Sequence, residues 1–127
     1  MLRLIALCLL SYTVSDTFAM CSMLSTNLDE ARIQLARAAV ENDFDYARIY
    51  ANRAQGALDD LAASALDCRC EQAQSQFDGS SARTRKARDA ASARQFSEEV
   101  NGAVKDFNAG INALRTCAAQ GTLKPSP

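Results

Sequence analysis

Four cysteines constrain the fold of this chain more than any other feature of its sequence. Cys21 lies before the first helical stretch, Cys68 and Cys70 flank Arg69 near the midpoint, and Cys117 ends the last helical stretch. If the chain runs up, down, up and down, all four cysteines fall at one end of a helical bundle, which is the geometry that two disulfides require. The spacing therefore predicts an up-and-down bundle closed by two disulfides at one end.

The first 19 residues are predicted to be a secretory signal peptide. Arg3 precedes an apolar run, residues 4–10, that is too short to span a bilayer, and we expect cleavage after Ala19. Cys8 would leave with this leader. The other four cysteines form an even set, which is typical of disulfides in an oxidising compartment, so the periplasm or the extracellular medium is the expected location.

A lipoprotein signal is the alternative interpretation of this leader. Cys21 lies where a lipidated cysteine would lie, but Met20 occupies the position at which such a signal has Gly, Ala or Ser. Lipidation would also leave an odd number of thiols. We therefore expect simple cleavage, and we expect no membrane span after it because no later stretch is apolar enough.

Composition narrows the classes of function. The sequence has 14 Lys and Arg against 15 Asp and Glu, so neither nucleic acid nor an anionic membrane surface is an expected partner. Histidine is absent, which removes the usual general base and the commonest transition-metal ligand. Alanine is frequent, as in closely packed helices, and this composition suggests a bacterial source. We expect a non-enzymatic protein that holds no cofactor and no metal.

Apolar periodicity predicts four helices. Asn27 followed by Glu30 resembles a capping box, so the first helix is expected to begin at Asn27 or one turn earlier. Asp43 is suited to cap the second helix, and Ser92 with Gln95 resembles another capping box before the last one. The predicted seams of the second and last helices are Phe44, Ala47, Ala51, Ala54, Leu58, Leu61 and Ala65, and Phe96, Val100, Ala103, Phe107, Gly110, Leu114 and Cys117.

The middle of the chain admits two topologies. The seam of the second helix ends at Cys68 and a new phase begins two residues later, which indicates a turn. Residues 78–81 are a second turn signal, which would instead fuse residues 44–77 into one long helix. At about 1.5 Å per residue, Cys117 would then lie too far from the central cysteines, because bridged Cα atoms lie within about 7 Å. We therefore predict four helices, with a kink or short break at Gly79.

The central cysteines are the best candidates for chemistry. Cys68 and Cys70 could form an exchangeable dithiol, and Arg69 could lower the pKa of a thiol. The structural alternative pairs one of them with Cys21 and the other with Cys117. Each such bridge would stabilise the fold by roughly 3 to 4 kcal/mol in the chain-entropy model. Because a bundle with many core alanines buries little area per residue, we expect structural bridges, and a redox pair is the alternative.

Three residues of the second helix are candidates for a partner surface. Tyr46, Tyr50 and Arg53 follow helical spacing beside the apolar seam. Tyrosine and arginine are enriched at interaction surfaces. Packing against a neighbouring helix would explain Tyr50 equally well, so both interpretations stay open.

Other charged groups predict no site. The basic residues Arg83, Arg85, Lys86 and Arg88 point in different directions around a helix, so we expect a solvated helix rather than an anion-binding patch. Adjacent carboxylates diverge on a helix, and the sequence contains no metal-ligand spacing and no glycine-rich phosphate loop.

The sequence thus predicts an all-α protein with a signal peptide at 1–19, a disulfide-bonded four-helix bundle at 20–120 and a flexible tail at 121–127. The expected function is that of a binding or accessory protein of the bacterial cell envelope, with an unidentified protein as its partner. Two alternatives are a thiol-disulfide redox protein and a carrier of a small apolar ligand held between helices. An enlarged apolar pocket near Phe77 and Phe107 would favour the carrier.

Overall fold

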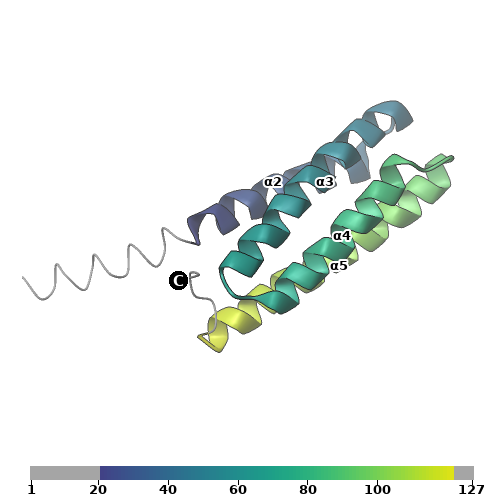
Figure 1. Ribbon diagram of the computed structural model, residues 1–127. Coiled ribbons are helices and arrows are strands. Elements are labelled where there is room, and N and C mark those ends of the chain that lie inside the picture. The colour runs from purple at the N-terminus through teal and green to yellow at the C-terminus, as the bar shows by residue number, and fades with distance from the viewer. Residues whose placement is uncertain (1–20, 122–127) are drawn as a thin grey trace, which may run out of the picture.

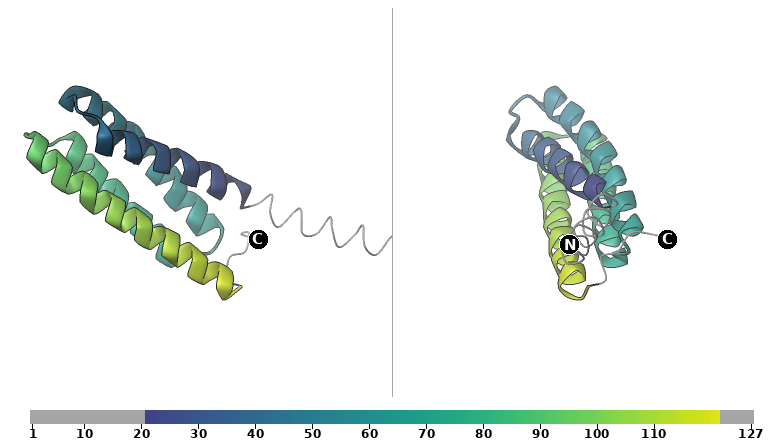
Figure 2. Two further views of the ribbon diagram at one scale, coloured as in Figure 1. Left: turned by 180° about the vertical axis from the view of Figure 1, so that it is seen from behind. Right: turned by 90° about the vertical axis from the view of Figure 1, so that its left-hand side faces the viewer.

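The computed structural model describes residues 21–121, which form four antiparallel α-helices (Figure 1). The helices are α2 (Ser22–Val40), α3 (Phe44–Asp67), α4 (Glu71–Arg88) and α5 (Ala93–Ala119). Figure 2 shows that α2 begins and α5 ends at one end of the bundle, while the α2–α3 and α4–α5 loops lie at the other. The predicted fold class is confirmed. The predicted signal peptide, and the predicted tail beyond residue 121, lie outside the described residues.

Each disulfide closes one helical hairpin. The Cys21–Cys68 bridge ties the start of α2 to the end of α3, and the Cys70–Cys117 bridge ties the start of α4 to the end of α5. A short loop joins the two helices of each hairpin at the opposite end. The chain is therefore two covalently closed hairpins joined through Arg69: the first hairpin consists of α2 and α3, and the second of α4 and α5.

The two hairpins repeat one another at a spacing of 49 residues. Cys70 follows Cys21 by 49 positions, Cys117 follows Cys68 by 49, and both bridges have a sequence separation of 47. Each position of the first hairpin thus has a structural equivalent in the second. Many equivalent positions share burial. The pairs in which both residues are buried include Leu24 and Ala73, Ala31 and Ser80, Leu35 and Thr84, Ala38 and Ala87, Ala47 and Phe96, Ala51 and Val100, Ala54 and Ala103, Leu58 and Phe107, Leu61 and Gly110, and Ala65 and Leu114.

Helix α3 follows the predicted pattern. Asp43 is its N-cap residue, and the carboxylate accepts hydrogen bonds from the backbone N–H groups of Asp45 and Tyr46. These bonds satisfy two of the donors that a helix start leaves open. The predicted seam is buried from Ala47 to Ala65, whereas its first residue, Phe44, is half-buried. Alanine at most of these positions lets the neighbouring helices approach closely.

Helix α5 also begins at its predicted cap, and its predicted seam is buried throughout. Ser92 Oγ accepts a hydrogen bond from the Gln95 N–H at 3.2 Å, as in a capping box. The reciprocal bond differs, because the Gln95 side chain accepts from the Ala91 N–H rather than from that of Ser92. The motif therefore marks the helix start correctly while closing one residue earlier than predicted.

The capping box expected at Asn27 is wrong. Helix α2 begins at Ser22, directly after Cys21, so the disulfide rather than a polar side chain anchors the helix start. Asn27 lies inside the helix and faces α3. Its side-chain amide donates to Ser64 Oγ at 2.6 Å and to the Asp60 carbonyl at 3.4 Å. A residue that resembles a cap thus serves as an interhelical contact.

The short break allowed for at Gly79 is wrong, because α4 runs through this glycine as one helix. The hydroxyl groups that indicated a turn are instead bonded to the flanking helices. Ser80 Oγ donates to the Ala103 carbonyl of α5 at 2.7 Å, and Ser81 Oγ donates to the Asp59 carboxylate of α3 at 2.6 Å. Because tertiary contacts satisfy these polar groups, the local preference for a turn is overridden.

The four helices do not pack equally. Helix α3 packs closely against α2 and α4, and α4 packs closely against α5, whereas α2 and α5 touch only lightly. One core cluster near the disulfides contains Phe77 and Phe107, with ring centroids 5.9 Å apart. A second cluster near the loops contains Phe96 and Val100. The seam between α2 and α5 is therefore the most open of the four.

Candidate functional site

The central cysteines belong to two different bridges. The Cα atoms are 5.9 Å apart in the Cys21–Cys68 pair and 6.0 Å apart in the Cys70–Cys117 pair, within the range of ordinary disulfides. Cys68 and Cys70 are 1% and 0% exposed. Arg69 adopts a left-handed backbone conformation with φ of 62°, which turns the chain from one hairpin into the next. The geometry gives no support to an exchangeable Cys68–Cys70 pair, because exchange requires an accessible thiolate.

The predicted tyrosine and arginine residues lie together with one residue that sequence reasoning missed. The guanidinium carbon of Arg53 lies 5.8 Å from the ring centroid of Tyr50, and that of Arg37, from α2, lies 6.0 Å from it. Tyr50 is half-buried against the core cluster near the loops that contains Phe96 and Val100, while Tyr46 is 60% exposed. We call Arg37, Tyr46, Tyr50 and Arg53 the tyrosine–arginine cluster. It spans the surface between α2 and α3.

Exposed apolar side chains accompany this cluster. Among residues 21–121, the large apolar side chains that remain exposed all belong to α2 and α3, namely Met23, Ile33, Val40, Tyr46, Ile49 and Leu66. Ile33, Val40 and Ile49 lie in the half of the first hairpin nearest its loop, as the tyrosine–arginine cluster does. We call these three residues and the cluster the outer face. Clustered exposed apolar groups are typical of interaction sites.

The second hairpin provides an internal comparison for the outer face. Its equivalent positions are polar or small, as the pairs Ile33 and Ala82, Arg37 and Lys86, Val40 and Asp89, Tyr46 and Gln95, Ile49 and Glu98, Tyr50 and Glu99, and Arg53 and Gly102 show. Because both hairpins have the same architecture, packing of a hairpin does not require apolar groups at these positions. The outer face is therefore a feature that the fold does not demand.

The basic residues of α4 do not gather on one side. Arg83 forms ion pairs with Glu99 at 3.8 Å and with Asp106 at 3.1 Å, both on α5. Arg85 and Lys86 are exposed. These contacts use Arg83 in the α4–α5 seam and leave no stripe of free cations along the helix.

Arg88 closes the α3–α4 seam at the loop end. Its Nη1 donates to Gln55 Oε1 at 2.8 Å and to Asn52 Oδ1 at 3.3 Å, and its own carbonyl accepts from Arg48 Nε at 2.7 Å. The side chain also donates to Asp89, and this hydrogen bond lowers the pKa of the Asp89 carboxyl from its ordinary value. Two long arginine side chains thus fill this part of the seam.

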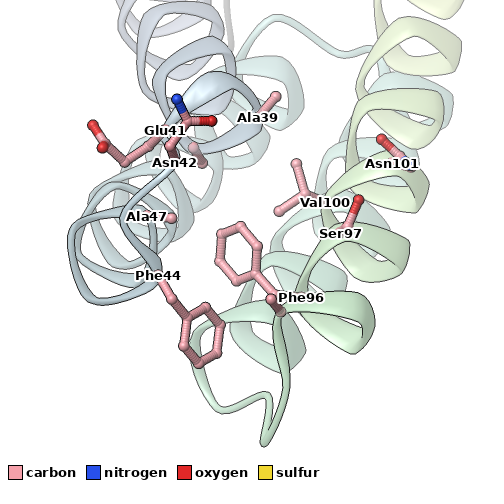
Figure 3. A pocket seen from close by; sticks show the side chains of 11 residues that line it. Ala39, Glu41, Asn42, Phe44, Ala47, Phe96, Ser97, Val100 and Asn101 are labelled. Carbon is pink, nitrogen blue, oxygen red and sulfur yellow. The ribbon is translucent and has the colours of Figure 1, made fainter.

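A pocket of about 150 Å³ opens at the loop end of the α2–α5 seam. Its inner wall is formed by Phe44 and Phe96, whose rings meet edge to face with centroids 5.8 Å apart, together with alanines of α2 and α3. Figure 3 shows Asn42 on one side of the pocket and Ser97 and Asn101 on the facing helix. The pocket therefore combines an aromatic wall with a polar rim.

The space near Phe77 and Phe107, where an enlarged pocket would have favoured a ligand carrier, is filled by these rings themselves. Both residues are buried, and the Phe77 ring lies so close to Gly110 that a Cβ added there would overlap it. The pocket described above lies at the opposite end of the bundle.

The structure places no metal centre or membrane span in residues 21–121. No group of three or more His, Cys, Asp or Glu side chains in this range could hold a metal ion, and no helix in it has the length and apolar character of a transmembrane segment. Two disulfides are typical of proteins in oxidising compartments outside the cytosol. No family model, curated protein or solved structure gives a significant match to this chain.

Sequence reasoning missed most of the outer face. Ile33, Val40 and Ile49 fall outside the apolar seams, and nothing in the first hairpin alone marks them as a group. Arg37 is distant in sequence from Tyr50. Comparison of the chain with itself at a shift of 49 residues would have revealed them, because apolar residues then align with polar or small ones.

Proposed function

We propose that this protein is an exported, non-enzymatic binding or accessory protein of the bacterial cell envelope, and that it engages a protein partner through its outer face. The observation that carries the proposal is the asymmetry between the hairpins. Two repeats of one architecture differ in that one exposes apolar groups, with Val40 at 76%, where the other has polar or small residues. Exposing such groups has no folding benefit, and it is accounted for if a partner covers them.

The charges of the outer face define the chemistry of the partner. Arg37 and Arg53 flank Tyr50, and neither forms an ion pair with a carboxylate among residues 21–121. Arginines that are held in place by an aromatic ring are preorganised to bind carboxylates. The partner is therefore expected to present a segment on which carboxylates flank aliphatic side chains. An acidic amphipathic helix laid across the outer face fits this description.

The covalent frame suits such a role. A rigid surface loses less conformational entropy when it binds, and each helix pair that carries or supports the outer face is closed at both ends. The redox alternative has less support, because Cys68 and Cys70 are buried and bridged to different partners.

Site-specific photo-crosslinking in the native host tests the outer face directly. A benzophenone amino acid is placed at Ile49 of the full chain and, as the matched control, at its equivalent Glu98 in the second hairpin. Both positions are exposed on the outside of a helix, so accessibility is similar. We expect a discrete crosslinked protein from position 49 at a yield about tenfold above that from position 98, because hot-spot contacts concentrate on one patch. Mass spectrometry of the product identifies the partner and the contacting segment.

Charge reversal tests the chemistry of the contact. Arg37→Glu should abolish the crosslink from position 49, whereas Lys86→Glu at the equivalent position should leave it unchanged. Stability should change by no more than about 0.5 kcal/mol in either variant, as for exposed positions generally. Equal yields from both hairpins, a product that survives Arg37→Glu, or a crosslinked segment without carboxylates would contradict the proposal. A product formed with a second copy of this chain would replace the heterologous partner with self-association.

A further inference from the structure

The pocket at the loop end of the α2–α5 seam can be compared with an equivalent place on the other side of the bundle. The 49-residue repeat relates the α2–α5 seam to the α4–α3 seam, so Ala39 corresponds to Arg88 and Ser97 corresponds to Arg48. Arg88 and Arg48 fill the α3–α4 seam at this level. Alanine and serine stand at the equivalent positions of the α2–α5 seam, and they line the pocket of about 150 Å³.

The two seams differ both in how closely their helices pack and in the side chains at this level. In the closely packed α3–α4 seam, long side chains fill this place, whereas the α2–α5 seam, in which the helices touch only lightly, has small residues there. One residue is the same in both seams: Asn101 is equivalent to Asn52, which accepts a hydrogen bond from Arg88. Asn101 lines the pocket, and the residue at the position equivalent to Arg88 is Ala39, which cannot donate a side-chain hydrogen bond to it. A hydrogen-bond acceptor is thus kept where the group that would use it is missing.

The walls define what fits. Phe44 and Phe96 already form an edge-to-face pair, and a third ring placed against them would extend the same favoured geometry. A cavity of about 150 Å³ is the size that accepts a single benzene ring. Asn42, Ser97 and Asn101 stand around the opening and can exchange hydrogen bonds with a polar group at the edge of that ring (Figure 3).

The geometry points to a binding site for one six-membered aromatic ring that carries a hydrogen-bonding group, with the ring against Phe44 and Phe96 and the polar group at the Asn42, Ser97 and Asn101 rim. Two sources share this chemistry: a free phenol-like compound, and a phenylalanine side chain whose own backbone amides reach the rim. The site is separate from the outer face and does not depend on the partner proposed above.

Amide chemical-shift titration of the oxidised full chain tests the site with phenol and with N-acetyl-phenylalanine amide, and with N-acetyl-alanine amide as the ringless control. We expect saturable shifts confined to residues 38–47 and 93–101, with a dissociation constant in the millimolar range, as small ligands allow. Tighter binding of phenol identifies a free ligand as the source, and tighter binding of the phenylalanine amide identifies a side chain. Equal shifts from the alanine amide, shifts spread over all four helices, or no saturation would overturn the inference.

A matched pair of substitutions places the ligand. Ala39→Arg introduces the residue of the equivalent position and should weaken binding about tenfold by filling the pocket, whereas Ala36→Arg, on the same helix but outside the pocket, should have no effect. Ser97→Arg, which again copies the equivalent residue, repeats the test from α5 in case the first variant folds poorly. Binding that survives both filled variants would exclude this pocket. None of these outcomes bears on the crosslinks from the outer face.

Discussion

Removal of the Cys21–Cys68 bridge by the double substitution Cys21→Ala and Cys68→Ala is expected to lower the free energy of unfolding by about 4 kcal/mol. The bridge closes a loop with a sequence separation of 47 residues, so its loss restores a large conformational entropy to the unfolded chain. The same loss is expected for Cys70→Ala with Cys117→Ala, because the second loop has the same separation. Urea unfolding followed by circular dichroism measures both values.

The comparison between the two double variants is the control for this prediction. Unequal packing near the bridges would separate the two values, whereas the entropic account predicts that they agree within about 1 kcal/mol. A loss of less than about 1 kcal/mol in either variant would show that the bridges do not hold the hairpins closed in the folded ensemble. With both bridges removed, we expect the chain to be largely unfolded, since a small helical domain has a total stability of only about 5 to 15 kcal/mol.

Gly110→Ala is expected to destabilise the protein by about 2 kcal/mol, although alanine is the better helix former. The added Cβ would overlap the ring of Phe77, which is wholly buried. Gly56→Ala is the matched control, because Gly56 is also a helical glycine but has nothing within 4 Å of an added Cβ. That variant should gain up to about 1 kcal/mol. Thermal unfolding of the two variants therefore gives changes of opposite sign.

The equivalent positions of the first hairpin suggest how to rescue this variant. Phe77 and Gly110 correspond to Leu28 and Leu61. The second hairpin thus pairs a large side chain with a glycine where the first hairpin pairs two leucines. Phe77→Leu combined with Gly110→Ala should be more stable than the sum of the two single changes predicts, because the smaller side chain makes room for the Cβ. Additive losses would indicate that the ring and the glycine do not limit one another.

The helix seams could be predicted because burial leaves a periodic signal along the chain. The residues predicted to be buried in α5, from Phe96 to Cys117, are the ones that the structure buries, and Ser92 marks the start of the helix as its side chain predicts. The cysteine positions selected the topology for a similar reason: only four antiparallel helices bring Cys117 within bridging distance of the central pair.

Predictions of caps and turns from local sequence were wrong where the polar side chain forms its hydrogen bond with another helix. The side chains of Asn27 and Ser80 have the hydrogen-bonding capacity expected of a cap and of a turn, but they use it on α3 and on α5. A single stretch of sequence does not contain that information. The same limit applies to the pocket, whose lining includes Ala39 and Ser97 from distant parts of the sequence.

The outer face was predicted only in part. Tyr46, Tyr50 and Arg53 follow from residue type and spacing, whereas Arg37 joins them from α2 once the hairpin brings the two helices together. The apolar periodicity of a helix reports which residues are buried within the chain, and it contains no information about a second molecule. Within the chain, the strongest indication of an interaction surface is the contrast between the outer face and the equivalent positions of the second hairpin.

The division of the chain into two covalently closed hairpins underlies the repeat, the outer face and the pocket, and disulfide mapping tests it most directly. The protein is purified from its native host, free thiols are alkylated at once, and the unreduced chain is digested and analysed by mass spectrometry. We predict two bridges, Cys21–Cys68 and Cys70–Cys117, and no alkylated cysteine in residues 21–121. A Cys68–Cys70 bridge, or bridges that join Cys21 to Cys70 and Cys68 to Cys117, would contradict the two-hairpin account.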